Sequence, residues 1–273
     1  MAPTLANRPV ARHSLRVMQG ERGLMLELSV TGWALAVVAA IAVGLSKGGL
    51  AMVGIISVPL MSLVMSPVQA AGLLLPIYVV SDVGGLIAFR RNFDRRVLML
   101  ALPGAMAGIA VGWATASIVP VRGVTLIVGV IGLGFALNAL IRPLREGAPR
   151  RASGAAATIW GGMAGYTSFV SHAGAPLWQV YAQPLRLSPL IYAGTTTWFF
   201  AIGNWIKLIP YAALGQLSLA NLATAAVLMP LSLVAVWAGL RLVRVIPPKL
   251  FYQLITWGLL AVSLRLIWQA VAG

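Results

Sequence analysis

Five ionisable residues stand within long apolar stretches of the sequence: Lys47, Asp82, His172, Lys207 and Arg265. A charge at the centre of a bilayer costs about 2.5–3.5 kcal/mol on insertion scales, so such residues are candidates for function. An ammonium group with nearby hydroxyls and backbone N–H groups suits an oxyanion. A carboxylate or an imidazole can carry a proton. The set therefore indicates an anion site within a membrane.

The stretch 44–50, GLSKGGL, interrupts a long apolar run with a lysine, a serine and two adjacent glycines. Each glycine weakens a helix by about 1 kcal/mol relative to alanine. The stretch favours a discontinuous membrane helix, whose broken ends expose N–H groups that can hold an anion. On this interpretation Ser46, Lys47, Gly48 and Gly49 bind substrate. A short interfacial turn with a snorkelling lysine is the alternative.

A second break, with the sequence SHAGAP, begins at Ser171 after the apolar stretch 155–170. Lys47 and His172 occupy the two breaks, which predicts that both approach a common centre. We expect Ser171, His172 and Gly174 to complete the substrate site.

The helix predicted after the first break carries Tyr78 and Asp82, which lie one turn apart on the same face. Asp82 is expected to pair with Lys47 or His172, or to relay a proton; a purely structural pair is the alternative. Asn204 occupies the place of Asp82 in the second half. We therefore predict that Tyr78, Asp82 and Asn204 line the site or couple transport to an ion.

Two further charges are interpreted differently. Lys207 follows Asn204 by three residues, and its distance from Ser188 places it near a membrane surface, where a snorkelling lysine is expected. Arg265 lies in the middle of a segment, where helix packing, a dimer contact and a site role are equally plausible.

The composition is that of a polytopic helical membrane protein. Of 273 residues, 60% are hydrophobic and 9% charged, and several apolar runs reach the roughly 20 residues that cross a bilayer. The net charge of +15 does not indicate a nucleic-acid partner, because most basic residues form clusters beside predicted spans, as the positive-inside rule produces. The clusters are Arg8/Arg12/Arg16/Arg22, Arg90/Arg91/Arg95/Arg96, Arg142/Arg145/Arg150/Arg151 and Arg241/Arg244/Lys249.

Enzymatic, metal and cofactor functions find no support in the sequence. It contains no H-E-x-x-H or G-x-S-x-G motif, no cysteine, two histidines and five carboxylates. A hydrolase would need a second acid–base partner or a metal. We predict a protein that is not an enzyme, with neither a metal nor a cofactor.

The sequence repeats its plan. The pattern S-P-x-x-x-A-G occurs at Ser66 and again at Ser188, and both serine–proline pairs are typical helix starts. We predict an all-α fold of two homologous halves, with about 8–10 helical segments and a broken helix in the first segment pair of each half. The expected divisions are a basic tail at 1–27, a first repeat at 28–142, a polar linker at 143–153 and a second repeat at 154–273.

The basic clusters bear on the relation between the halves. If the clusters at 90–96, 142–151 and 241–249 all face the cytoplasm, the halves are inverted repeats and the N-terminus lies outside. A parallel duplication keeps the N-terminus inside but places the last cluster outside. We favour inversion because three clusters then agree.

These features together resemble the TauE/SafE family of sulfite and organosulfonate exporters, from about Val43 to Ala270. The sequence differs from the family pattern at the second break, which usually reads G-x-G-G-P in the family and reads HAGAP here. This difference suggests a site adapted to a particular substrate. The motifs that carry the resemblance are Gly44–Gly49, Val58-Pro59-Leu60, Ser66-Pro67, Ala70-Ala71, Leu75-Pro76, Asp82, the P-G-x-x-x-G-x-x-x-G run Pro103–Gly112, and Gly174, Pro176 and Tyr181.

The resemblance implies efflux of small anions across a bacterial inner membrane. We expect a secondary transporter that exports sulfite or a short organosulfonate by alternating access around the two breaks, with Asp82 or His172 as proton-coupling candidates. Its expected partners are the anionic substrate and membrane lipid. A homodimer is a further possibility that the sequence does not decide. An anion channel and a non-transporting membrane scaffold are the rival interpretations.

Overall fold

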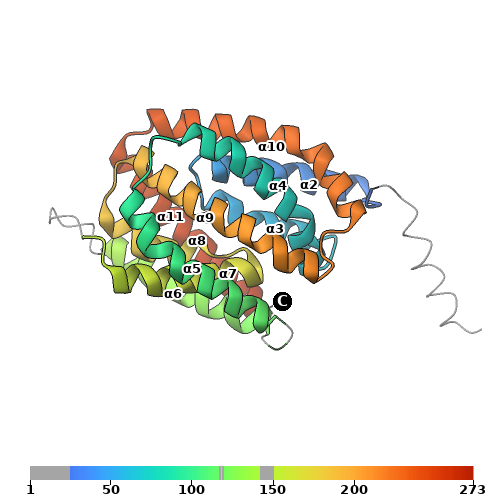
Figure 1. Ribbon diagram of the computed structural model, residues 1–273, viewed down its shortest axis with the longest axis horizontal. Coiled ribbons are helices and arrows are strands. Elements are labelled where there is room, and N and C mark those ends of the chain that lie inside the picture. The colour runs from blue at the N-terminus through green and yellow to red at the C-terminus, as the bar shows by residue number, and fades with distance from the viewer. Residues whose placement is uncertain (1–24, 117, 119, 142–150, 273) are drawn as a thin grey trace, which may run out of the picture.

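The computed structural model describes residues 25–116, 118, 120–141 and 151–272, which form helices joined by short connections (Figure 1). The first half contains α2 (Val30–Lys47), the 3-10 helix η3 (Val53–Ile56), α3 (Ser57–Met61), α4 (Pro67–Ala88), α5 (Arg95–Ala114) and α6 (Val121–Ile141). The second contains α7 (Gly154–Ser171), α8 (Ala175–Ala182), the 3-10 helix η4 (Gln183–Leu185), α9 (Pro189–Ala213), α10 (Leu219–Val245) and α11 (Pro248–Ala272).

Six of the described helices, α2, α4, α5, α6, α10 and α11, are long and apolar enough to cross a bilayer. Large apolar side chains on their outer faces are exposed, such as Ile127, Val227 and Trp237. In water such a surface would be unfavourable, whereas lipid tails solvate it. The predicted all-α polytopic membrane fold is confirmed.

The predicted helix start at Ser66 is present in full. The Ser66 hydroxyl accepts a hydrogen bond from the Gln69 N–H, the Gln69 side chain accepts one from the Ser66 N–H, and Pro67 takes the first helical position. Ser188 and Pro189 begin α9 in the corresponding way, although the Ser188 side chain makes no capping bond.

Both predicted breaks are tips of helical hairpins. After α2 ends at Lys47, the chain turns at Gly49, whose φ of +116° strongly favours glycine, and η3 and α3 pack back along α2. α7 ends at Ser171, His172 adopts a left-handed conformation with φ 53°, and α8 packs back along α7. Each break therefore brings backbone ends into the interior, as a discontinuous membrane helix does.

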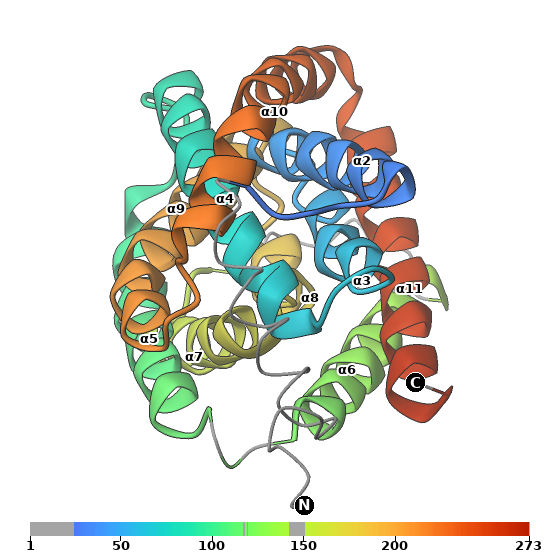
Figure 2. The same ribbon diagram turned by 90° about the vertical axis from the view of Figure 1, so that its right-hand side faces the viewer.

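Each hairpin is held by a helix of the other half. Figure 2 shows α2 beneath α10 and α7 beside α5. Glycines permit this close approach: a Cβ at Gly44 would overlap the backbone of Ser232, and a Cβ at Gly108 would overlap the Gly162 carbonyl oxygen.

Corresponding helices of the two halves run antiparallel where they meet. On α4 and α9, Asp82 contacts Asn204, while the later Gly85 packs against the earlier Thr197. On α6 and α11, the Arg122 side chain donates to the Ala270 carbonyl, and Gly132 packs against the earlier residue Ser263. This is the arrangement that an inverted repeat produces.

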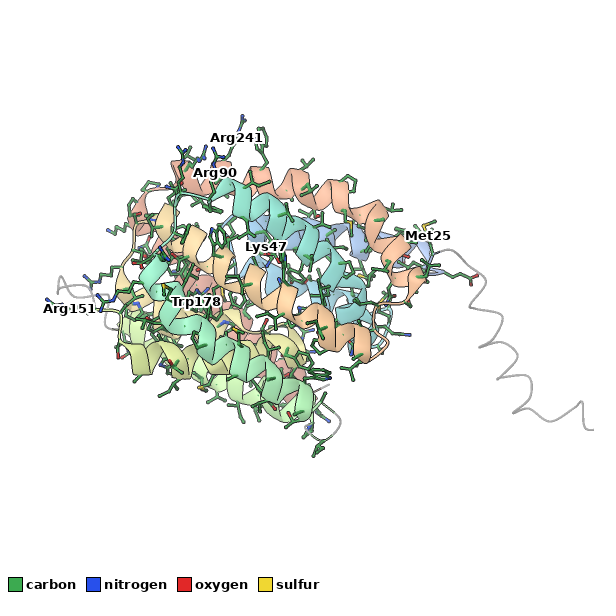
Figure 3. All side chains as sticks on the ribbon, in the orientation of Figure 1. Met25, Lys47, Arg90, Arg151, Trp178 and Arg241 are labelled. Carbon is green, nitrogen blue, oxygen red and sulfur yellow. The ribbon has the colours of Figure 1, made fainter. Side chains whose placement is uncertain are left out.

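The described residues of three basic clusters, at 90–96, at Arg151 and at 241–249, gather at one end of the molecule, whereas Arg122 lies at the other end beside Ala270. Figure 3 places Arg90, Arg151 and Arg241 at this end, and Met25 at the opposite end. Most of the predicted tail (1–27) and most of the predicted linker (143–153) lie outside the described residues. Arg265 is exposed on α11 and is not part of an interior site.

Candidate anion-binding site

The centre of the site is a buried ion pair between the end of α2 and the middle of α4. The Lys47 Nζ lies 2.7 Å from the Asp82 Oδ1, and Asn204 on α9 donates from Nδ2 to Asp82 Oδ2 at 2.9 Å. Lys47 is 4% exposed and Asp82 0%, so both charges lie away from bulk solvent. In Figure 3, Lys47 lies near the middle of the view. The expected pairing of Asp82 is thus with Lys47.

A cavity of about 40 Å³ lies next to this pair, between the two hairpin tips. Both halves supply polar groups to it. Its lining residues are Ser46, Lys47, Ala51, Gly54, Ile55, Tyr78, Ser168, His172, Ala175, Thr196, Thr197, Phe200 and Asn204.

Tyr78 contacts both Lys47 and His172 at the cavity with its ring. Its ring stacks on the His172 imidazole with centroids 5.3 Å apart, and the Lys47 Nζ lies 5.0 Å from its centroid. Its hydroxyl donates to the Gly54 carbonyl at 2.9 Å and lies 2.8 Å from the Ser57 hydroxyl. Tyr78 therefore ties η3 and α3 to the helix that carries Asp82.

Lys207 is a second buried cation, and the snorkelling interpretation of this residue was wrong. Its side chain is 0% exposed, and Nζ donates to the carbonyl and the hydroxyl of Ser168, both at 3.1 Å. A cation is favourable at the C-terminal end of α7, where carbonyl groups lack helical partners. Because Ser168 lines the cavity, the charge of Lys207 stands directly behind its wall.

His172 closes the cavity on the side away from the basic end. Its Nε2 lies 2.9 Å from the Tyr211 hydroxyl, which also donates to the Phe169 carbonyl at 3.2 Å. Tyr211 lines a second cavity of about 150 Å³, and Ile55 lines both cavities. The His172–Tyr211 contact and Ile55 therefore separate two neighbouring spaces.

A family model, the sulfite exporter TauE/SafE family, matches residues 36–266 of the chain. The chain belongs to the TauE/SafE family. It is therefore a membrane transport protein of a family named for sulfite export. Comparison with curated proteins and with solved structures gave no match.

In this TauE/SafE protein, the central cavity brings together five of the residues that we singled out from the sequence. Ser46, Lys47, Tyr78, His172 and Asn204 all line it. Asp82 stands behind Lys47 as its ion-pair partner.

The glycines of the two breaks and Ser171 do not line this cavity. A Cβ at Gly48 would overlap the Val236 carbonyl, and Gly49 packs against Ala193 and Val243. Gly174 packs against Ala164 and Ser168, while Ser171 lines the neighbouring second cavity. Sequence spacing identified the breaks, but the contacts of these glycines are with helices.

Sequence reasoning missed Ser168 and Gly54, which line the cavity. Ser168 and Gly54 lie outside the two motifs, and no short pattern marks them. Thr197 donates to the Lys47 carbonyl at 3.3 Å, and the Thr196 hydroxyl accepts from the Trp178 indole at 2.9 Å. For Lys207, the spacing from Asn204 and Tyr211, one turn before and one turn after it, was a usable signal.

The described residues contain no group of three potential metal-ligating side chains. What the cavity offers is an ammonium, hydroxyls and an amide. Groups of this kind can donate hydrogen bonds to an anion.

Proposed function

We propose that this protein exports a small sulfur-containing oxyanion, sulfite or a short organosulfonate, across a bacterial inner membrane. One observation carries the proposal: among the described residues, the buried charged side chains are Lys47, Asp82 and Lys207. With both lysines protonated, two cations stand against one carboxylate beside the cavity. A buried charge is unfavourable without a partner, so an entering anion is the natural counter-ion.

The size of the cavity favours the smaller substrates. A water molecule needs about 10–15 Å³ of such a volume, so about 40 Å³ holds roughly three waters. Sulfite, with four heavy atoms, suits this space better than a sulfonate with a longer chain.

The packing of the helices supports alternating access. Lys47 and Tyr78 belong to a group formed by α2, α3, α4 and α10, which share a buried apolar cluster. His172 follows α7 and Asn204 lies on α9, and α5, α7, α8 and α9, the second group, contribute to another buried apolar cluster, although α9 also packs against α4 of the first group. The cavity lies between the groups, so relative motion of the groups would open it to either side in turn. We propose that residues 28–142 and 154–273 are inverted repeats. Each of the two groups contains helices from both repeats.

Competition for Lys47 offers a route to proton coupling. The Asp82 carboxylate and the substrate anion would both bind the Lys47 ammonium. A carboxylate that loses its ammonium partner in a buried site is stabilised by taking up a proton. Anion binding and proton binding would then be linked.

Purified protein should be screened by thermal shift against sulfite, sulfate, thiosulfate, taurine, isethionate and sulfoacetate, because a ligand of the native state raises stability by mass action. We expect sulfite to give the largest shift, and proteoliposomes to show saturable sulfite flux that responds to an imposed proton gradient. Flux that rises linearly with concentration would indicate the rival channel. A scaffold would show neither stabilisation nor flux.

The basic end should face the cytoplasm. Because the sequence has no cysteine, single cysteines report sidedness cleanly. We expect an impermeant maleimide added to intact cells, with the outer membrane permeabilised, to label Ala213→Cys at the end of α9. Arg91→Cys, at the basic end, should react only after the inner membrane is opened. Both residues are exposed, so reversed labelling would refute this orientation.

A further inference from the structure

A third cavity lies at the basic end and shares no lining residue with the central cavity. It has a volume of about 700 Å³ and is formed where α6 ends and where η4, α9 and α11 begin. Its polar lining includes Gln183, Arg186, Lys249, Tyr252 and Thr256. None of these residues belongs to the proposed transport site.

The pocket has the features of an anion site at a membrane surface. Arg186 and Lys249 line it with positive charge. Ser188 and Pro189 at the start of α9, and Pro248 at the start of α11, line it too. The N-terminal ends of two helices therefore meet there, and the helix dipole favours negative charge at such ends.

Gln183 gives an independent indication of a ligand. It is 2% exposed, and its Nε2 donates to the Thr256 hydroxyl at 2.7 Å. That hydroxyl in turn donates to the Tyr252 carbonyl at 2.9 Å. Gln183 Oε1 is left buried without a donor among the described residues. A buried acceptor without a partner is unfavourable, so a ligand that brings a donor would satisfy it.

The remaining walls are apolar and continue onto the outer surface of the helices. Leu140, Leu187 and Trp257 line the pocket, and Trp257 is 57% exposed. Tryptophan is enriched where a helix meets the headgroup region. A soluble anion gains nothing from these walls, whereas the acyl chains of a lipid would cover them.

We propose that this pocket binds the headgroup of an anionic phospholipid with a glycerol headgroup, phosphatidylglycerol. Its phosphodiester lies by Lys249, Arg186 and the two helix starts, and a headgroup hydroxyl donates to Gln183 Oε1. Basic pockets between membrane helices on the cytoplasmic side are suited to such lipids. The lipid holds α6, α9 and α11 together at this end. The inference does not depend on the transported substrate.

Native mass spectrometry of the purified protein tests the site, with dioleoyl phosphatidylglycerol, dioleoyl phosphatidylcholine and soluble glycerol phosphate as probes. We expect wild-type protein to retain phosphatidylglycerol at least fivefold more than phosphatidylcholine, and glycerol phosphate not to displace it at millimolar concentration. Displacement by glycerol phosphate would show a site for soluble phosphates and overturn the lipid proposal.

Two matched variants separate the pocket from general surface charge. Lys249→Gln should lose at least fivefold in phosphatidylglycerol retention. Arg244→Gln removes an equally exposed charge that does not line the pocket, and should bind as wild type does. Equal losses in both variants would overturn the proposal. If Lys249→Gln does not fold, Gln183→Leu serves instead: it should reduce the preference for phosphatidylglycerol over phosphatidic acid, and an unchanged preference would refute the headgroup contact.

Discussion

Replacing Lys47 with methionine is expected to weaken anion binding by more than tenfold, about 1.4 kcal/mol or more. Methionine keeps much of the bulk and removes the charge that faces the cavity between the hairpin tips. Lys47→Arg should retain weak binding, because the charge survives while shape and reach change. Isothermal calorimetry with sulfite at fixed ionic strength measures all three affinities.

The ion pair complicates this experiment, and a double variant resolves the complication. Lys47→Met leaves the Asp82 carboxylate buried with only the Asn204 amide, and breaking a buried pair in this way typically destabilises a protein by about 3–5 kcal/mol. Adding Asp82→Asn removes the stranded charge. We expect the double variant to recover most of the stability and none of the affinity.

Asp82→Asn alone separates binding from coupling. It frees Lys47 for the anion, so binding should persist or strengthen, while flux should no longer respond to a proton gradient. If Lys47→Met binds sulfite as tightly as wild type, the anion does not use Lys47, and the ion pair is structural.

The sequence was sufficient to locate the charged centre, because charge inside an apolar segment is rare and costly. Lys47, Asp82 and His172 stood out for this reason, and the two S-P-x-x-x-A-G patterns placed Asn204 opposite Asp82. If the halves are the inverted repeats that we propose, the axis that relates them passes near this pair, since corresponding residues of antiparallel helices meet where the axis crosses them. Their contact at 2.9 Å follows from that geometry.

What could not be predicted depends on which helices pack together. α2 packs against α10, and α7 packs against α5, so each hairpin contacts a helix from the other half of the chain. No local sequence pattern predicts these pairings. Gly48 therefore looked like part of an anion cradle, although its missing side chain admits the backbone of α10. The distance along α9 from its start at Ser188 predicts that Lys207 lies near a membrane surface. In the fold, the Lys207 side chain reaches the end of α7, donates to Ser168 and is fully buried.

The glycines of the α5–α7 interface should be among the positions where adding a single methyl group destabilises the protein most. A Cβ at Gly108 would overlap the Gly162 carbonyl oxygen and lie 2.9 Å from the Tyr166 nitrogen. Because these obstacles are backbone atoms, no rotamer change relieves them, and the helices must separate. We expect Gly108→Ala to destabilise the protein by about 3 kcal/mol, the upper end of overpacking costs, and to lower Tm by roughly 6–12 °C.

Gly134→Ala is the matched control, because it makes the same chemical change in a helix of the same fold. A Cβ there meets nothing within 4 Å, so the added methyl group should be neutral or stabilise α6 by up to about 1 kcal/mol. Thermal unfolding in the same detergent compares the two variants directly. Equal Tm values would mean that α5 and α7 are not in backbone contact. The pairing of each hairpin with a helix of the other half, on which the two-group description of alternating access rests, would then be wrong.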